Sequence, residues 1–475
     1  MKICIICEGS YPYIPGGVSS WVQMICEQFT EHEFYILAIA TTREEMNEYK
    51  YKIPDSIKEI ITIYLADIRY KEKHQKVRLN DKEFNVFRDL ILGDELLDNF
   101  TSSMAFLGKY RELMMDLLMG EYFYTICLEK YNKEKSKKPF SDFLWNMRGM
   151  YLPFMYILSS DLPEADVYHS VSTGYAGLMG SNASHLFNCP FILSEHGIYT
   201  REREEDIIRS DWVDGEFKDI WTDFFKKLSL IAYKQANVVT SLFEVNKTLQ
   251  VELGCNSEKI KIIPNGIDTV GLSGFKNHNK LDTETFNVAA ILRVVPIKDV
   301  KTMILAFDIV REKTNNAKLY LMGNTEENKE YYEECIELIK QLGIEGVEFL
   351  GQVAIKEYLA EVDVLLITSI SEGQPLAILE GMAAEIPFIC TNVGDCKSLL
   401  MGNQDDDLGE AGVIVPVMDN AAIANAILLL MNNPGKRKRM GKVGRKRVIE
   451  YYRQDIFIDA YRELYRKVGG IAWQE

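Results

Sequence analysis

The feature that most constrains the fold is an alternation of short apolar strands with helices, which begins twice along the chain. Near the N-terminus, a predicted strand over 2–7, a glycine-rich turn and a helix over 18–29 precede a second strand over 33–40. That spacing is typical of a parallel β-α-β unit. The alternation restarts at residue 286, so we expect an α/β protein with two doubly wound, Rossmann-like sheets.

The same pattern suggests where the domains divide. Residues of about 70–160 show helical periodicity, which predicts a helical insertion, and the polar segment 273–285 has the composition of a linker. We therefore place an N-terminal domain at 1–275 and a C-terminal domain at 276–454, with a last helix over about 455–475 packing back on the first domain. The remaining strands are predicted at 167–170, 191–194, 238–241, 260–263, 286–292, 317–322, 346–350, 362–368 and 386–391.

Charge and hydropathy limit the partners. The 475-residue chain holds 54 Lys and Arg against 70 Asp and Glu, a formal net charge of −16. Such a chain repels polyanions, and phosphate neutralisation supplies most nucleic-acid affinity. The first apolar run, 3–7, is too short for a signal peptide, and no run reaches the roughly 18 to 20 apolar residues that cross a bilayer. We expect a cytoplasmic protein with no transmembrane segment and no nucleic-acid partner.

One stretch departs from this acidic balance. In the run 436–447, eight of twelve residues are Lys or Arg. The simplest interpretation is a solvated helix face. Because the rest of the chain is acidic, a peripheral contact with the inner face of an anionic membrane stays open as the alternative.

Several chemistries lack sequence support. The nine cysteines lie mostly within apolar runs, which indicates buried thiols in a reducing compartment. Cys4 and Cys7 form a C-x-x-C, but on a strand they face opposite sides. No zinc-hydrolase, serine-hydrolase or P-loop motif occurs. We therefore predict no metal site and no cofactor.

The stretch most informative about function is Ser371–Glu380, which joins a buried strand to a helix. Its loop lies at the carboxyl end of a parallel strand, where ligands bind in open α/β sheets. The helix that begins near Leu376 offers amides to a phosphate, and Glu372 and Glu380 could accept hydrogen bonds from sugar or ribose hydroxyls. The alternative is that Glu372 caps the helix and Glu380 is a surface residue.

Two cations follow the first strand of the second domain. Arg293 and Lys298 can project from that strand end toward the cleft that would also receive Glu372. Fixed cations there would neutralise a diphosphate and stabilise it as it leaves. The alternative is a solvated lysine and an arginine held in an ion pair.

The first domain offers weaker candidates. Gly16 and Gly17 allow a backbone to approach a ligand closely, although the turn does not match G-x-G-x-x-G. His169 and His196 each lie near the end of a predicted strand, at the ligand edge of the first sheet. A single histidine is more often structural, so neither assigns a function alone.

Together these motifs resemble family 4 of the retaining glycosyltransferases, whose GT-B fold has two Rossmann-like domains facing across a cleft. The resemblance rests on Glu372 and Glu380, on Arg293 with Lys298, on Gly16 with Gly17, and on Pro264-Asn265-Gly266-Ile267-Asp268. More narrowly, Tyr11–Trp21 and Glu195–Arg203 resemble the PelF-like subgroup, cytoplasmic transferases of Pel exopolysaccharide synthesis. Many relatives carry alanine where this chain has Gly381, a change expected to loosen the helix.

The resemblance implies residue roles. It places donor-sugar hydroxyls on Glu372, the ribose on Glu380, the diphosphate on Arg293 and Lys298, and the transferred sugar beside His196. The predicted catalytic residues are Arg293, Lys298, Glu372 and His196. The predicted donor-binding residues are Gly16, Gly17, His169, Arg293, Lys298, Gln352, Val353, Glu372, Gly373, Gln374, Pro375, Leu376, Ala377 and Glu380.

By this resemblance the chain is a retaining, metal-independent glycosyltransferase. It would transfer a hexose or N-acetylhexosamine from a UDP-sugar, bound by the C-terminal domain, to a growing exopolysaccharide on the N-terminal domain. The resemblance also implies an inner-membrane synthase complex as partner. Alternatives are a GT-B nucleotide-sugar epimerase and a non-catalytic nucleotide-binding subunit, whereas the missing dinucleotide fingerprint disfavours a nicotinamide oxidoreductase.

Overall fold

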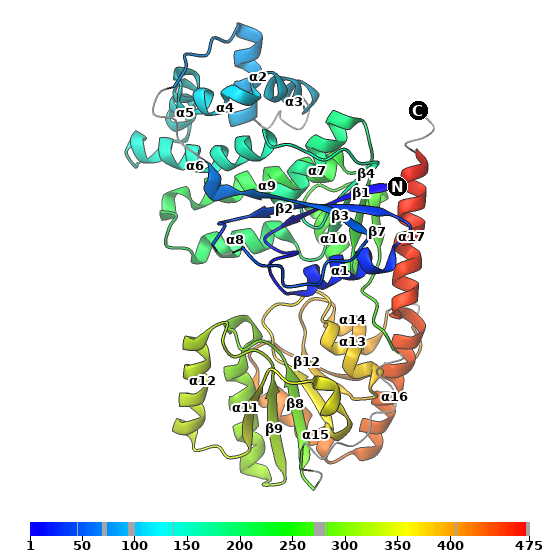
Figure 1. Ribbon diagram of the computed structural model, residues 1–475. Coiled ribbons are helices and arrows are strands. Elements are labelled where there is room, and N and C mark those ends of the chain that lie inside the picture. The colour runs from blue at the N-terminus through cyan, green and yellow to red at the C-terminus, as the bar shows by residue number, and fades with distance from the viewer. Residues whose placement is uncertain are drawn as a thin grey trace. The chain divides into compact units, whose positions relative to one another are not determined.

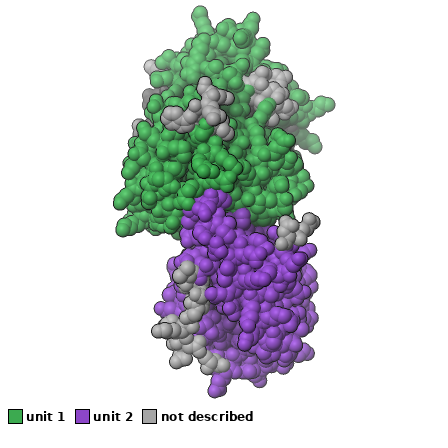
Figure 2. Space-filling view, turned by 90° about the vertical axis from the view of Figure 1, so that its right-hand side faces the viewer, with its two compact units in different colours: residues 1–263, 461–475 green, residues 264–460 purple. Residues whose placement is uncertain are grey.

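Two parallel sheets organise the chain, and each lies in a separate unit (Figures 1 and 2). The first unit comprises residues 1–263 and 461–475, and the second comprises residues 264–460. The predicted boundary at 275/276 lies outside the described residues, and the structure divides the chain after Ile263 instead. The computed structural model describes residues 1–44, 46–68, 74–93, 100–135, 137–269, 281–282, 284–403 and 406–471.

The first unit contains a seven-stranded sheet of order β3-β2-β1-β4-β5-β6-β7, in which every pairing is parallel. Its central strand β1 is almost fully buried, as its continuous apolar run predicts. Sequence patterning missed β3, because its residues alternate only weakly between apolar and polar. The strands are β1 (Lys2–Glu8), β2 (Glu33–Ala40), β3 (Ile57–Tyr64), β4 (Val167–Ser170), β5 (Phe191–Glu195), β6 (Val238–Ser241) and β7 (Ile260–Ile262).

Helices cover this sheet and form the insertion. In the insertion, α6 packs against α4 and α5 and also contacts α7, so one continuous apolar core joins the insertion helices to the sheet (Figure 1). The covering helices are α1 (Gly17–Gln28), α7 (Gly174–Phe187), α8 (Tyr199–Arg209), α9 (Lys218–Gln235) and α10 (Glu244–Glu252). The insertion helices are α2 (Asp81–Leu92), α3 (Phe100–Lys109), α4 (Met114–Met119), α5 (Glu121–Glu134) and α6 (Phe140–Leu158).

The second unit contains a six-stranded parallel sheet of order β10-β9-β8-β11-β12-β13. Its strands are β8 (Phe286–Ile291), β9 (Ala317–Met322), β10 (Val347–Gly351), β11 (Val364–Ile367), β12 (Phe388–Thr391) and β13 (Gly412–Val415). Its helices are α11 (Val300–Lys313), α12 (Lys329–Leu342), α13 (Leu376–Ala383), α14 (Cys396–Met401), α15 (Asn420–Met431) and α16 (Pro434–Tyr451). Strand β13 was not predicted from the sequence.

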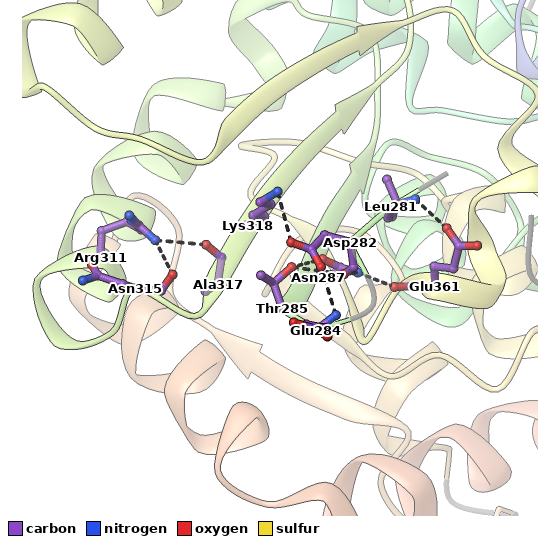
Figure 3. Close-up of polar contacts among 10 residues, drawn as sticks. All are labelled: Leu281, Asp282, Glu284, Thr285, Asn287, Arg311, Asn315, Ala317, Lys318 and Glu361. Carbon is purple, nitrogen blue, oxygen red and sulfur yellow. Dashed lines mark hydrogen bonds and ion pairs between the residues drawn. The ribbon is translucent and has the colours of Figure 1, made fainter. Parts of the chain in front are cut away.

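Polar contacts fix the segment that enters β8 (Figure 3). The Asn287 amide nitrogen donates to the carbonyls of Asp282 at 2.9 Å and Glu361 at 2.8 Å. The Leu281 amide donates to a Glu361 carboxylate oxygen at 2.6 Å, and Lys318 pairs with Asp282 at 3.4 Å. The first strand of this sheet therefore begins at a fixed place.

The last helix, α17 (Gln454–Ile471), ends within the first unit. The hydroxyl of Tyr465 lies 2.7 Å from His169 Nδ1, and that of Tyr461 lies 3.1 Å from Ser194 Oγ. Both tyrosines are fully or almost fully buried. No helix in the described part of the chain is long and apolar enough to traverse a bilayer.

The basic run 436–447 forms most of α16, but it is not a uniformly solvated face. Arg447 is fully buried. Its guanidinium is hydrogen-bonded to Asp406 and donates to the carbonyls of Leu399 and Leu400 at 3.1 and 2.9 Å. A charge pattern alone could not separate this residue from its exposed neighbours.

Candidate functional site

The second sheet reverses its strand order between β8 and β11, and such a switch point opens a crevice at the strand ends. Lys298 lies in a short 3-10 helix, Pro296–Lys298, that follows β8. Glu372 lies in the loop that follows β11. The two sequence motifs are therefore adjacent because their strands are neighbours in the sheet.

Lys298, Ser369 and Glu372 form one polar cluster. Lys298 Nζ donates to Glu372 Oε1 at 2.5 Å, and Ser369 Oγ donates to the same oxygen at 2.5 Å. The side chains of Lys298 and Glu372 are only 19% and 12% exposed. Glu372 does not cap the following helix, since Pro375 occupies that position. The cluster presents a partly desolvated ammonium and carboxylate, both capable of binding a polar ligand.

Backbone contacts hold Lys298 in place. The Thr368 hydroxyl lies 3.0 Å from the carbonyl oxygens of both Lys298 and Asp299. The Ile370 amide donates to the Ile297 carbonyl at 2.9 Å. The loops after β8 and β11 are therefore joined, which fixes the lysine relative to Glu372.

Contacts of Gln374 and Gly394 hold the loop that carries Glu372. Gln374 is buried, and its side chain donates to Asp395 Oδ2 at 2.7 Å and accepts from the Asn265 amide at 2.7 Å. Gly394 has φ +52°, and a Cβ there would lie 2.2 Å from the Glu372 carbonyl oxygen. Gln374, predicted to bind a donor, thus uses both ends of its side chain to shape the loop.

Helix α13 begins at Leu376 with no side chain capping its first turn. Glu380 is half-buried; burial raises its pKa, and the Lys356 cation opposes that shift. A Cβ on Gly381 would lie 2.4 Å from Leu365 Cδ1 and 2.5 Å from the Phe388 ring. The glycine expected to loosen the helix therefore allows it to pack closely on β11 and β12.

The other predicted residues of this unit are less enclosed. Arg293 is 58% exposed and pairs with Glu327 at 2.6 Å, as the ion-pair alternative expected. Gln352 and Val353 follow β10, two strands from β8, and Gln352 is exposed. Gly373, Pro375 and Ala377 are partly exposed around the start of α13.

In the first unit, Gly16 and Gly17 border open space. Gly16 has φ 169°, an extended conformation that any residue adopts, and a Cβ on either glycine would meet nothing within 4 Å. Neither glycine is needed to avoid a clash in this structure. The two positions leave room for a ligand at the start of α1.

The two candidate histidines differ. Both ring nitrogens of His169 are hydrogen-bonded, to Tyr465 and to Ser194 at 2.7 Å each, and the side chain is fully buried. That placement argues against direct contact between His169 and a donor substrate.

His196 Nε2 is buried with no hydrogen-bond partner in the described residues, and Trp21 packs edge-on against its ring at 5.0 Å. Burial lowers the pKa of His196 to about 4, so the ring is neutral near pH 7.

In the first unit, a side chain of the protein occupies the position at the strand switch point where an anion could bind. This unit reverses strand order between β1 and β4, and α7 follows β4. Glu8 Oε2 accepts from the amides of Tyr175 at 2.8 Å and Ala176 at 3.1 Å, in the first turn of α7. A carboxylate of the chain thus occupies the helix N-terminus that a ligand phosphate would otherwise use.

Glu195 anchors the strand end that carries His196. It accepts hydrogen bonds from the Tyr199 amide at 3.2 Å, the Tyr233 hydroxyl at 2.6 Å and the Gln250 amide nitrogen at 2.9 Å. Burial raises the pKa of Glu195 from 4.5 to about 7, although these hydrogen bonds oppose the shift. The folded protein therefore binds this proton more tightly than the unfolded chain does.

Replacing Glu195 by glutamine is expected to change the pH dependence of stability. The proton on Glu195 stabilises the folded protein fully below about pH 4.5. This stabilisation falls as the pH rises and is lost above about pH 7. Between pH 4.5 and 8, the free energy of unfolding of the wild type should thus fall by up to about 3 kcal/mol relative to that of E195Q. Urea midpoints across this range measure the difference. The exposed Glu244→Gln is the control, and parallel curves for E195Q and wild type would contradict the assignment.

Two protein-family models match the chain. Residues 1–258, more than half of the chain, match the family described as "Domain of unknown function (DUF3492)", so the chain belongs to that family. Residues 275–447, which carry Lys298 and Glu372, match "Glycosyl transferases group 1". The chain thus carries a group 1 glycosyl transferase domain over 275–447. The cluster after β8 and β11 lies within that domain.

Curated proteins similar to this chain have names that differ in the product or pathway they give. N-acetyl-alpha-D-glucosaminyl L-malate synthase of Bacillus anthracis is 31% identical over 175 residues, 36% of this chain and 43% of the relative. The capsular polysaccharide biosynthesis glycosyltransferase CapM of Staphylococcus aureus is 24% identical over 237 residues, 49% of this chain and 58% of the relative. The chain thus spans about half the length of these curated relatives.

Solved structures share the whole architecture. Sucrose-phosphate synthase from Thermosynechococcus elongatus matches with a TM-score of 0.62 at 15% identity, covering 99% of both chains. Anabaena HepE in complex with UDP-glucose matches with a TM-score of 0.60 at 15% identity, covering 98% of this chain and 100% of HepE. At this identity the likeness concerns the fold alone, which is GT-B, as predicted.

Sequence reasoning missed several residues around these sites. Ser369, Asp395 and Glu8 carry no motif that marks them, and only the fold brings each to its partner. A signal existed for Ser369, because it follows a buried strand at the ligand edge. Asp395 gave no such signal, since its role depends on contact with Gln374.

Proposed function

We propose that the chain is a glycosyltransferase, which takes its sugar from a UDP-sugar bound at the strand ends of the second unit. The observation that carries this proposal is the cluster of Lys298, Ser369 and Glu372 at the switch point between β8 and β11. The first unit supports the choice indirectly, because Glu8 already occupies the anion site at its own switch point.

The diphosphate would lie between Lys298 and the start of α13. A lysine ammonium has three donors, and one of them is used by Glu372. The others, with the uncapped amides near Leu376, suit phosphate oxygens. Arg293 is exposed enough to turn from Glu327 toward the same anion. These charges would stabilise UDP as it leaves.

The proposed contacts to the sugar, the ribose and the base follow from where the candidate residues lie at the strand ends. Glu372 would accept hydrogen bonds from the donor sugar, Glu380 from the ribose, and the backbone at Gln352 and Val353 would meet the base. Uridine is proposed because HepE, which has the same fold, was solved with UDP and with UDP-glucose. The sugar itself is a hexose or an N-acetylhexosamine in this proposal.

The proposed reaction retains the anomeric configuration and needs no metal. The bond between the anomeric carbon and the phosphate oxygen breaks, and the acceptor hydroxyl oxygen bonds to that carbon on the same face. The hydroxyl proton passes to the departing phosphate, so no protein nucleophile is required. The neutral His196, whose Nε2 has no hydrogen-bond partner among the residues that the structure describes, would hydrogen-bond the transferred sugar.

The proposed acceptor is a growing extracellular polysaccharide, made in the cytoplasm with an inner-membrane synthase complex. Support comes from the resemblance of Tyr11–Trp21 and Glu195–Arg203 to the PelF-like subgroup and from the similarity to CapM. Open space at Gly16 and Gly17 leaves room for such an acceptor on the first unit.

A thermal-shift panel followed by turnover tests this function. We expect UDP and one UDP-sugar to raise the melting temperature, with GDP, ADP and NAD giving no shift, because only a ligand of the native state stabilises it. UDP release should then depend on added polysaccharide acceptor and persist in EDTA. Stabilisation by NAD alone would contradict the proposal. Conversion of the UDP-sugar to an isomer without UDP release would support the epimerase.

A further inference from the structure

The eight cations of the run 436–447 on α16 divide into two sets of four. The first set is bound to carboxylates of the second unit: Lys436 with Glu410 at 3.9 Å, Arg437 with Asp363 at 3.2 Å, Arg445 with Glu385 at 3.8 Å, and Arg447 with Asp406. This set holds the helix to the fold. A Cβ on Gly441 would lie 1.9 Å from the Glu385 carbonyl oxygen, which shows how closely that side packs.

The second set, which we name the basic face of α16, points to solvent. It comprises Lys438, Arg439, Lys442 and Lys446. All four are exposed, and in the described part of the chain none of them forms an ion pair within 4.0 Å. At 3.6 residues per turn they fall within an arc of about 100° over a length of about 12 Å.

Few acidic groups lie near the basic face: Asp406 interacts electrostatically with Lys446, and Glu450 lies at the edge of the face. The four side chains, with Gly435 and Val443, line a shallow depression of about 400 Å³. No Asp or Glu occurs from Pro434 to Ile449 in the sequence. Ile449 lies in the same arc and is 39% exposed, and Glu450 follows at its edge. The face therefore combines four exposed cations with two apolar side chains, Val443 and Ile449.

We propose that the basic face of α16 docks on the surface of an anionic lipid bilayer. Clustered lysines and arginines on a helix are attracted to anionic headgroups. The chain as a whole carries a net charge of −16 despite this run, so an anionic bilayer repels other faces and selects this one. A nucleic acid is disfavoured as the occupant, because its affinity comes from neutralising many phosphates and the chain carries a net charge of −16. Because Val443 and Ile449 offer little apolar surface, docking is reversible and dependent on salt.

Co-sedimentation with vesicles tests this inference. The full chain should sediment with vesicles of phosphatidylglycerol and phosphatidylcholine at low salt, and not with pure phosphatidylcholine. Binding should disappear near 1 M NaCl, where the Debye length is about 3 Å. Replacing Lys438, Arg439, Lys442 and Lys446 by glutamine should lower the partition coefficient at least about tenfold.

A matched variant controls for net charge. Lys58, Lys82, Lys133 and Lys261 are exposed lysines of the first unit, and their replacement by glutamine removes the same four charges. This variant should bind vesicles far better than the α16 variant, and both should melt as wild type does. Equal binding by the two variants, or wild-type binding to pure phosphatidylcholine, would overturn the proposal. Binding of an RNA homopolymer through the basic face, without vesicle binding, would also overturn it and favour nucleic acid.

Discussion

Replacing Lys298 by alanine is expected to lower the kcat/KM of donor turnover by about 10² to 10³, because a preorganised donor to the leaving diphosphate is lost. The fold should survive, since Thr368 contacts the carbonyl oxygen of Lys298, which alanine retains. Glu372 keeps its hydrogen bond from Ser369. Steady-state kinetics with the UDP-sugar selected by thermal shift measure the loss.

Lys301→Ala provides the matched control. This lysine lies three positions farther along, is 41% exposed and pairs with Glu334 at 2.7 Å, so its removal takes away the same charge from a neighbouring surface. We expect turnover close to that of wild type. If K298A and K301A were equally active, Lys298 would not bind the diphosphate. Arg293→Ala should also reduce turnover, because its guanidinium is proposed to reach the same anion.

The second large effect concerns stability rather than activity. Replacing Arg447 by alanine should destabilise the second unit by about 3 to 5 kcal/mol, the cost of breaking a buried ion pair. Its side chain is 1% exposed, and it donates to the Gly409 carbonyl at 2.6 Å besides its contacts with Asp406, Leu399 and Leu400. Burial pushes the pKa of Asp406 up, but the Arg447 hydrogen bonds more than offset it, so that pKa is lowered.

Urea denaturation of R447A and of the exposed Arg439→Ala tests this expectation. The R439A midpoint should remain near that of wild type, since surface changes usually shift stability by less than about 0.5 kcal/mol. A double variant, Arg447→Met with Asp406→Asn, should recover part of the loss, because no uncompensated charge stays buried. Equal midpoints for R447A and R439A would show that the buried pair contributes little.

Much of the fold follows from local patterning. Strands such as β8 and β9 are mostly apolar, each with one polar residue near its start, so their position and their place in a parallel sheet are readable from sequence. Strands β3 and β13 were missed because their apolar pattern is weak or short. The division after Ile263 depends on which side chains pack together, which no linker composition reveals.

The proximity of two candidate residues was predictable because the end of a strand determines the position of each. Lys298 and Glu372 meet because β8 and β11 are neighbours, a consequence of the strand order that the α/β pattern implies. Side-chain orientation was not readable. Gln374 turns toward Asp395, and His169 turns into the core toward Tyr465, a residue almost three hundred positions away. Such long-range contacts leave no local signature.

A crystal structure of the chain with UDP would show directly where the donor binds. We expect diphosphate oxygens within hydrogen-bond distance of Lys298 Nζ and of the first amides of α13, with ribose hydroxyls on Glu380. UDP bound away from the ends of β8 and β11, with Lys298 still paired only to Glu372, would contradict it.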